Sequence, residues 1–229
     1  MKGKTWIKKS MAMKKLFSVF LLLFLMTSAY AQSKFKLTFL ASPQVAWLKS
    51  DSKEISPDRS FLGFGYGIEG DFYLGSENYA LTTGLTMSSA GGSLIYAPSI
   101  SFDGKALPVG TKIEYFIKYV EVPLAIKMRS KDFNRTRIFA QFGITNWFNV
   151  GTKASTSDNT FQKEGVKGEV KLYNIGLNVG TGLEYDLGHG NSLTGGLVYS
   201  NGLLDATSNS TISESTTLKV VRFRLGFVF

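Results

Sequence analysis

The chain has 229 residues, of which 44% are apolar, and it contains 24 glycines, 18 phenylalanines and no cysteine. This length allows one large domain or two small ones, and the lack of cysteine excludes disulfides, thiolate metal sites and cysteine nucleophiles. The formal net charge is +9, but six of the 26 basic residues lie in the first 31 positions, where there is no acid. The rest of the chain contains 20 basic and 17 acidic residues, which gives it a net charge of +3. No nucleic-acid partner is therefore predicted.

Residues 1–31 have the pattern of a secretory signal peptide. Two lysines precede an apolar run over 16–26, and small residues up to Ala31 predict cleavage near that position. The run is about half of the roughly 20 residues that a membrane-spanning helix needs. A second methionine ahead of this run offers another start, so residues 1–12 are interpreted as a candidate upstream artefact. We therefore expect an exported mature domain over 32–229.

Apolar and polar residues alternate with a period of two through most of the mature chain, which is the pattern of strands with two different faces. Eight such segments follow one another. In chain order they lie at about 35–47, 62–74, 81–88, 119–128, 137–145, 177–186, 193–200 and 220–229. No amphipathic helix interrupts them, so an all-β domain is predicted.

The connections between these segments alternate in length. The short ones are 74–78, 129–136 and 187–191. The long ones, rich in Ser, Thr, Gly, Asp, Asn and Lys, are 49–60, 89–111, 151–169 and 205–216. An antiparallel up-and-down β-barrel with both termini on the short-turn side gives this alternation, and transmembrane barrels of the bacterial outer membrane have short periplasmic turns and long extracellular loops.

The direction of the apolar face decides between a membrane barrel and a soluble one, because a lipocalin-like barrel has the same alternation turned inside out. The polar face is rich in Gly, Ser and Thr, whereas a soluble exterior usually carries many Lys and Glu. Small residues suit the crowded lumen of an eight-stranded barrel. We therefore predict that the apolar face contacts lipid and that the polar face lines the lumen.

Charged residues on the polar face are balanced in sign, as expected for a narrow lumen, because an unpaired buried charge is costly. The predicted lumen charge network consists of Glu69, Asp71, Glu121, Lys127, Arg137, Glu184, Asp186, Arg222 and Arg224. Aromatic residues near the predicted strand ends indicate two interfacial girdles. The turn-side girdle is expected to contain Phe72, Tyr73, Tyr79, Tyr185, Phe227 and Phe229, and the loop-side girdle Trp47, Tyr115, Phe116, Phe148 and Tyr173.

The stretch YVEVPLAIK at 119–127 resembles the hallmark of the PorT-like outer-membrane β-barrel family of Bacteroidota. Segments at 62–74, 82–91 and 178–187 are also similar to that family, whereas ASPQVAW in the first strand stands where a Gly- and Asn-containing segment is usual. The resemblance covers nearly all of 32–229. It implies an eight-stranded barrel in the outer membrane of a Gram-negative bacterium, in a family whose founding member is linked to gliding and protein secretion.

The final segment, VVRFRLGFVF at 220–229, ends on an aromatic residue. The resemblance implies that the barrel-assembly machinery recognises this strand through an assembly signal of Phe223, Leu225, Phe227 and Phe229. Edge pairing between this strand and the sheet of the machinery supplies a physical reason. The alternative is a plain closing strand, and the two interpretations are compatible.

Catalysis is not predicted. The single histidine, His189, lies in a predicted turn, where no Ser or acid is placed to form a relay with it. The acids in the loops lack a recognisable calcium-ligand spacing. The glycine-rich stretches at 63–67 and 176–182 do not open a helix, as a phosphate-binding loop would. No cofactor and no metal are expected.

The leading interpretation is a non-enzymatic scaffold of the outer membrane, surrounded by lipid and contacting a protein partner through its loops or periplasmic turns. A narrow channel or a carrier of hydrophobic ligands in the same membrane is the second interpretation. A wide pore is not expected, since eight strands enclose a lumen just wide enough for side chains. A soluble periplasmic barrel that binds apolar ligands inside is the third.

Overall fold

The computed structural model describes residues 35–166, 168–208 and 215–229, so the predicted signal peptide at 1–31 lies outside the described residues. Eight long strands form the wall of the domain: β1 (Phe35–Ser50), β2 (Ile55–Tyr73), β3 (Tyr79–Tyr96), β6 (Lys112–Arg129), β7 (Thr136–Thr156), β9 (Tyr173–Gly188), β10 (Asn191–Gly202) and β11 (Thr216–Val228). The short strands β4 (Ile100–Phe102), β5 (Lys105–Leu107) and β8 (Gln162–Gly165) lie in the long connections. Within the described ranges, no helix is long and apolar enough to cross a membrane.

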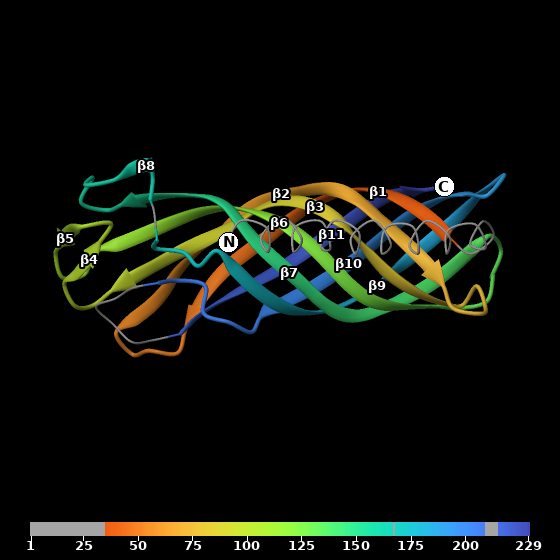
Figure 1. The fold of residues 1–229 in the computed structure, drawn as a ribbon, viewed down its shortest axis with the longest axis horizontal. Coiled ribbons are helices and arrows are strands. Elements are labelled where there is room, and N and C mark those ends of the chain that lie inside the picture. The colour runs from red at the N-terminus through yellow and green to blue at the C-terminus, as the bar shows by residue number, and fades with distance from the viewer. Residues whose placement is uncertain (1–34, 167, 209–214) are drawn as a thin grey trace, which may run out of the picture. The chain divides into compact units, whose positions relative to one another are not determined.

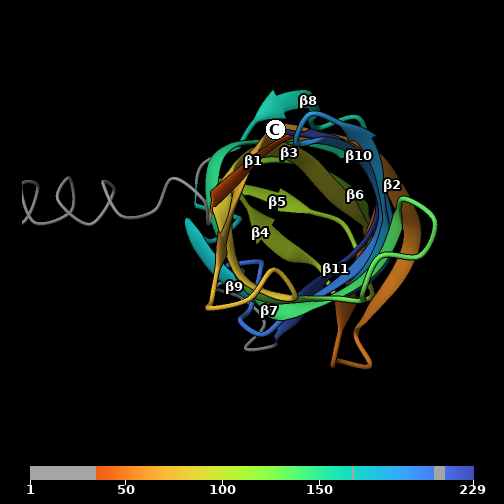
Figure 2. The same ribbon diagram turned by 90° about the vertical axis from the view of Figure 1, so that its right-hand side faces the viewer.

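The wall strands form one sheet that closes on itself. The strand order is β6, β3, β2, β1, β11, β10, β9 and β7, and β6 also pairs with β7. The first and last strands are antiparallel partners, with Thr38 opposite Val228 at one end and Ser50 opposite Thr216 at the other. Closure gives every wall strand two partners, which satisfies the main-chain groups that hydrocarbon cannot hydrogen-bond. The predicted eight-stranded, antiparallel up-and-down barrel is confirmed (Figures 1 and 2).

The outward-facing side chains form an apolar belt around the barrel. Large apolar side chains are exposed on all eight wall strands, and among them Leu124, Phe142 and Leu183 are 44%, 52% and 52% exposed. Glu121, three positions from Leu124 on the opposite face of β6, is only 2% exposed. Contiguous apolar surface on this scale marks an interaction site or a membrane contact. The apolar face therefore points outward, as predicted, and a soluble barrel with a polar exterior does not fit it.

At the loop end the wall strands extend further than the sequence analysis predicts. A tilted strand crosses a bilayer in about 9–11 residues, whereas β2, β3, β6 and β7 contain 19, 18, 18 and 21 residues. Much of the loops predicted at 49–60, 89–111 and 151–169 is therefore strand. Ser- and Lys-rich segments lack the apolar alternation that identifies a strand, but neighbouring strands extend them by pairing.

The lumen at the loop end is filled by an apolar plug, which the sequence analysis does not predict. The plug contains Leu48, Leu94, Tyr96, Phe102, Leu107, Ile113, Tyr115, Ile117, Trp147, Phe161, Leu218 and Val220, all buried. It is built where inward-facing wall residues meet the β4–β5 hairpin, which lies across the far mouth when the barrel is viewed from its turn end (Figure 2). The apolar plug closes the loop half of the lumen.

Aromatic contacts tie the β4–β5 hairpin to the wall. The ring centroid of Phe102 lies 6.0 Å from that of Tyr115 and 5.4 Å from that of Phe161. The hydroxyls of Tyr96 and Tyr115 are hydrogen-bonded at 2.8 Å. Tyr115 therefore belongs to the apolar plug, and its predicted place in the loop-side girdle is wrong. Its position on the inward face of β6 explains the difference.

Glycines of β9 and β10 make room for Trp147, which is fully buried. A Cβ atom on Gly176 would lie 2.5 Å from Cη2 of the Trp147 ring, and one on Gly202 would lie 3.4 Å from Cζ3. The indole thus lies over the neighbouring strand β9 and reaches the next strand, β10. Because protein interiors are close-packed, a larger residue at Gly176 must displace the ring.

We expect Gly176→Ala to destabilise the barrel by about 1–3 kcal/mol, because the added methyl group forces Trp147 out of its packing position. The measurement is the midpoint of urea unfolding in lipid vesicles. Gly195→Ala on β10 is the matched control, since a Cβ atom there has no neighbour closer than 3.7 Å. Both changes restrict the unfolded chain in the same way, so equal midpoints would contradict this account of the plug.

Candidate functional site

Between the apolar plug and the short turns, the lumen holds a cluster of charged side chains that we call the ion-pair core. Its members are Glu69 and Asp71 of β2, Glu121, Lys127 and Arg129 of β6, Glu184 of β9, and Arg222 and Arg224 of β11. They occupy alternate, inward-facing positions of their strands. Four acids face four bases, so the ion-pair core has no formal net charge.

Near the turn end, two bases share one carboxylate. Lys127 Nζ lies 2.6 Å from Glu184 Oε1 and 2.9 Å from Asp71 Oδ2, while Arg129 Nη1 lies 2.8 Å from Glu184 Oε2. The Thr82 hydroxyl donates a hydrogen bond to Asp71 at 2.5 Å. Each of these ions therefore has several partners, which offsets the cost of removing it from water.

Arg129 also connects the ion-pair core to the first short turn. Its Nε and Nη2 donate hydrogen bonds to the carbonyl oxygen of Glu77 at 3.0 and 2.7 Å. Its guanidinium carbon lies 4.3 Å from the centroid of the Tyr73 ring, a distance typical of a cation–π contact. Tyr73 is thus buried inside the barrel, and its predicted place in the turn-side girdle is wrong because it occupies an inward-facing position of β2.

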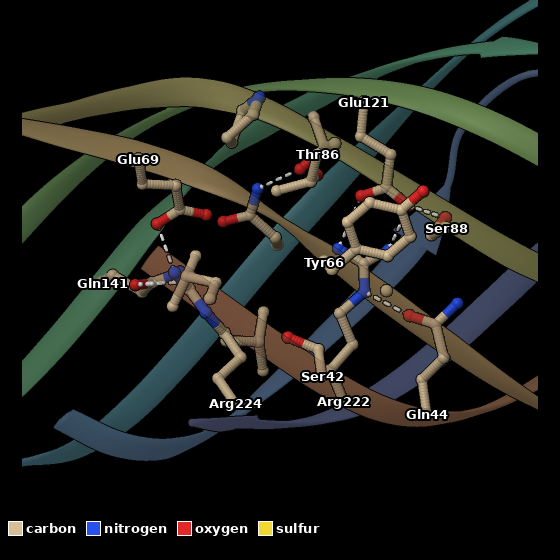
Figure 3. Close-up of a pocket in the computed structure, with 16 residues that line it drawn as sticks. Ser42, Gln44, Tyr66, Glu69, Thr86, Ser88, Glu121, Gln141, Arg222 and Arg224 are labelled. Atoms are coloured by element: carbon tan, nitrogen blue, oxygen red, sulfur yellow. Dashed lines mark hydrogen bonds and ion pairs between the residues drawn. The ribbon is translucent and has the colours of Figure 1, made fainter. Parts of the chain in front are cut away.

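Towards the apolar plug, the two arginines of β11 reach across the lumen (Figure 3). Arg224 forms an ion pair with Glu69 and donates a hydrogen bond to Gln141 Oε1 at 3.1 Å. Arg222 Nη1 and Nη2 lie 2.8 and 2.9 Å from the two carboxylate oxygens of Glu121. This bidentate geometry is the strongest form of an arginine–carboxylate pair.

Neutral polar groups complete the contacts of the Arg222–Glu121 pair. Arg222 Nε donates to Gln44 Oε1 at 3.0 Å, and the Ser88 hydroxyl donates to Glu121 Oε1 at 2.5 Å. A cavity of about 30 Å³ remains beside these residues, which is room for roughly two water molecules. Asn178 lines this cavity, and its Oδ1 has no hydrogen-bond partner among the described residues. Water is therefore the occupant that suits the cavity.

The structure brings seven of the nine predicted network residues into the ion-pair core and places Arg137 and Asp186 elsewhere. Arg137 lies at the turn end, where it pairs with Asp132 and, at 3.3 Å, with Glu77. Its guanidinium holds the pKa of the Asp132 carboxyl below its usual range. Asp186 is exposed and accepts a hydrogen bond from the Gly188 amide at 2.7 Å. Both occupy strand ends, where inward-facing positions open to water.

Arg129 is the member of the ion-pair core that the sequence analysis misses. The short connection predicted at 129–136 includes it, whereas the structure makes it the last residue of β6. Arg129 lies two positions after Lys127 and so continues the polar face of that strand. This spacing is the feature of the sequence that indicates an inward-facing Arg129. An arginine beside a turn is otherwise indistinguishable from a solvated one.

His189 lies at the rim of a second cavity, of about 310 Å³, at the turn end. Asp186 and Ser192 line the same cavity. A nucleophilic relay requires hydrogen bonds that join the base to both the nucleophile and the acid. No such bond to His189 occurs in the described part of the chain, where no metal-binding group of three or more His, Cys, Asp or Glu is found either.

Comparison with known proteins places the fold in context. Residues 30–208 match the family described as outer membrane protein beta-barrel domain. Comparison with curated proteins gives no match. The chain is similar to Neisserial surface protein A (13% identity, 85% of this chain and 95% of that chain, TM-score 0.47) and to a major outer membrane protein from Thermus thermophilus (14%, 85% and 98%, 0.47). It is also similar to the outer membrane protease OmpT from Escherichia coli (10%, 86% and 96%, 0.43). These similarities carry no argument about function.

We expect Arg224→Leu to lower the free energy of unfolding by about 3–5 kcal/mol, because Glu69 then remains in the lumen without its partner. Urea midpoints in lipid vesicles measure this loss. The double variant Glu69→Leu/Arg224→Leu should regain most of it, since neither charge is left unpaired.

The matched control for Arg224→Leu is Arg59→Leu. The Arg59 side chain is 75% exposed and lies 3.9 Å from Asp58, and such surface pairs contribute at most about 1 kcal/mol. If Arg224→Leu were no more destabilising than Arg59→Leu, the ion-pair core would not be a stabilising element.

Proposed function

Since this chain belongs to the outer membrane protein β-barrel domain family, we propose that it is a closed, non-enzymatic scaffold that presents its loop end to a protein partner outside the cell. The filled lumen carries this proposal. The apolar plug occupies the loop half, and the ion-pair core occupies the turn half. A cavity of about 30 Å³ lies beside Arg222 and Glu121, and the cavity of about 310 Å³ that His189 lines is at the turn end. A solute path would have to break both layers.

The folded loop end supports a role in binding. The Asp103 amide in the turn of the β4–β5 hairpin donates a hydrogen bond to Glu169 Oε1 at 2.7 Å, and Lys112 forms an ion pair with Asp58. Partial burial of the Glu169 carboxyl raises its pKa. A surface that is ordered before binding loses less conformational entropy when a partner docks.

The resemblance to PorT-like proteins suggests a narrower role in protein secretion. This role rests on the resemblance alone, and the partner is then a component of the secretion apparatus at the loops or the periplasmic turns. Deleting the gene and measuring exported cargo in the medium tests it. Unchanged secretion would contradict the narrower role in secretion but not the general scaffold function.

We expect the wild-type barrel to show no unitary conductance in planar bilayers, because both layers of the lumen are closed. The variant Phe102→Ala/Leu107→Ala loosens the β4–β5 hairpin but keeps the ion-pair core, so we expect it to stay closed as well. Heat-modifiable migration on gels verifies that each protein is folded. Reproducible conductance steps from the wild type would contradict the closed scaffold and favour a narrow channel.

We further propose that residues 1–31 are removed near Ala31 during export and that the barrel-assembly machinery recognises β11. Phe223 and Leu225, both about half exposed, and Phe229 lie on its lipid-facing side. The Phe229 ring contacts Phe227 at a centroid distance of 4.7 Å and Phe39 at 5.4 Å. These side chains are accessible to another sheet before the barrel closes on β1.

We expect Phe229→Ala to reduce assembly in cells several-fold while the purified protein still refolds in detergent. The readout is the heat-modifiable fraction in the outer membrane. Phe39→Ala is the matched control, since it removes the same ring contact from the other strand. If both variants assemble equally well, Phe229 contributes to the closing contact but not to an assembly signal.

A further inference from the structure

Four lysines lie on the outer wall at the loop-end edge of the apolar belt. They are Lys49 of β1, Lys118 of β6, Lys153 of β7 and Lys219 of β11. Lys49, Lys118 and Lys153 are exposed, and Lys219 is half-buried. Among the residues that the structure describes, none of their ammonium groups has an ion pair or a hydrogen bond. Four uncompensated positive charges thus border the lipid-facing surface.

The strand register arranges these lysines as two doublets, each beside an aromatic residue. Lys219 lies directly opposite Trp47, and Lys49 is two residues further along β1 on the same face. Lys153 lies directly opposite Phe116, and Lys118 is two residues further along β6. Diagonal neighbours on one face of a sheet are about 7–8 Å apart, so both ammonium groups of a doublet can converge on one anion.

The acids at the loop end do not neutralise these doublets. Glu114, two positions beyond Phe116 on β6, is the other diagonal neighbour of Lys153, and it forms no ion pair with Lys153 among the described residues. Glu164 adjoins Gly165, the β8 partner of Lys153, yet it forms no ion pair with Lys153 within the described ranges. At the turn end, Lys36 Nζ donates a hydrogen bond to the Gly190 carbonyl oxygen at 3.3 Å, and Lys131 lies in the 130–135 turn rather than on a strand. The two lysine doublets of the wall therefore lie at the loop-end edge of the belt.

A phosphate-bearing lipid fits this position. Trp and aromatic side chains anchor at the level of the headgroups, and Lys side chains extend from there while their stems stay on apolar surface. Each lysine at an anionic membrane surface contributes about 1 kcal/mol of attraction. We propose that the Lys49–Lys219 and Lys118–Lys153 doublets bind the phosphate groups of anionic lipids in the leaflet at the loop end. This goes beyond the scaffold function and does not depend on a closed lumen.

The test measures lipid retained by the protein in mixed micelles of neutral detergent, by native mass spectrometry. The probes are phosphatidylglycerol, which is anionic, and phosphatidylcholine, which is zwitterionic. We expect the wild type to retain phosphatidylglycerol in preference, and the preference to weaken as the salt concentration rises, because the attraction is screened. Lys49→Gln/Lys219→Gln and Lys118→Gln/Lys153→Gln should each lower the affinity for phosphatidylglycerol on the order of tenfold or more.

The matched control is Lys53→Gln/Lys131→Gln, which removes the same charge from exposed lysines of the 51–54 connection and the 130–135 turn. It should retain phosphatidylglycerol like the wild type. An equal loss in the control, or equal retention of the two lipids by the wild type, would overturn the proposal. So would displacement of the lipid by inorganic phosphate but not by chloride at the same ionic strength, since the doublets would then be sites for free phosphate. The salt series on the wild type decides the matter even if a variant fails to fold.

Discussion

Hydrocarbon offers no hydrogen-bond partner, and this constraint governs the whole molecule. Every main-chain group of the wall must find its partner within the sheet, so the first strand has to pair with the last. The β1–β11 ladder provides that closure from Thr38 to Ser50. Once eight strands close, the lumen is only wide enough for side chains. The inward-facing residues must therefore pack or pair with one another, because there is no room for bulk water to solvate them.

The lumen meets this requirement in two different ways along its axis. In the turn half, four acids and four bases neutralise one another, and amide and hydroxyl groups such as Gln44 and Ser88 complete their contacts. In the loop half, where the wall rises beyond the apolar belt, apolar side chains fill the interior and the β4–β5 hairpin covers them. Both layers restrict the passage of solutes through the barrel, so contacts with other molecules are expected at its surfaces.

A fold of this kind does not define a function by itself, since function depends on sites carried by the fold. Membership of the outer membrane protein β-barrel domain family accounts for the apolar belt and the closed sheet. The features that distinguish this chain lie at the loop end, in the ordered hairpin and in the lysine doublets at the edge of the belt. They suggest a barrel that is held in its leaflet by lipid phosphate and that offers a rigid surface to a partner.

The sequence by itself determined the strands and their faces, because a period of two is a local property that each segment carries independently. It also identified Glu121 and Arg222 as inward-facing charges before any partner was known. Only the tertiary structure decided that Arg222 meets Glu121, that Arg129 at a strand end meets Glu184, and that Phe102 of a long connection folds into the lumen. These contacts join residues far apart in the chain, and their formation depends on how far neighbouring strands extend each other. The periodicity within a single segment carries no information about these contacts.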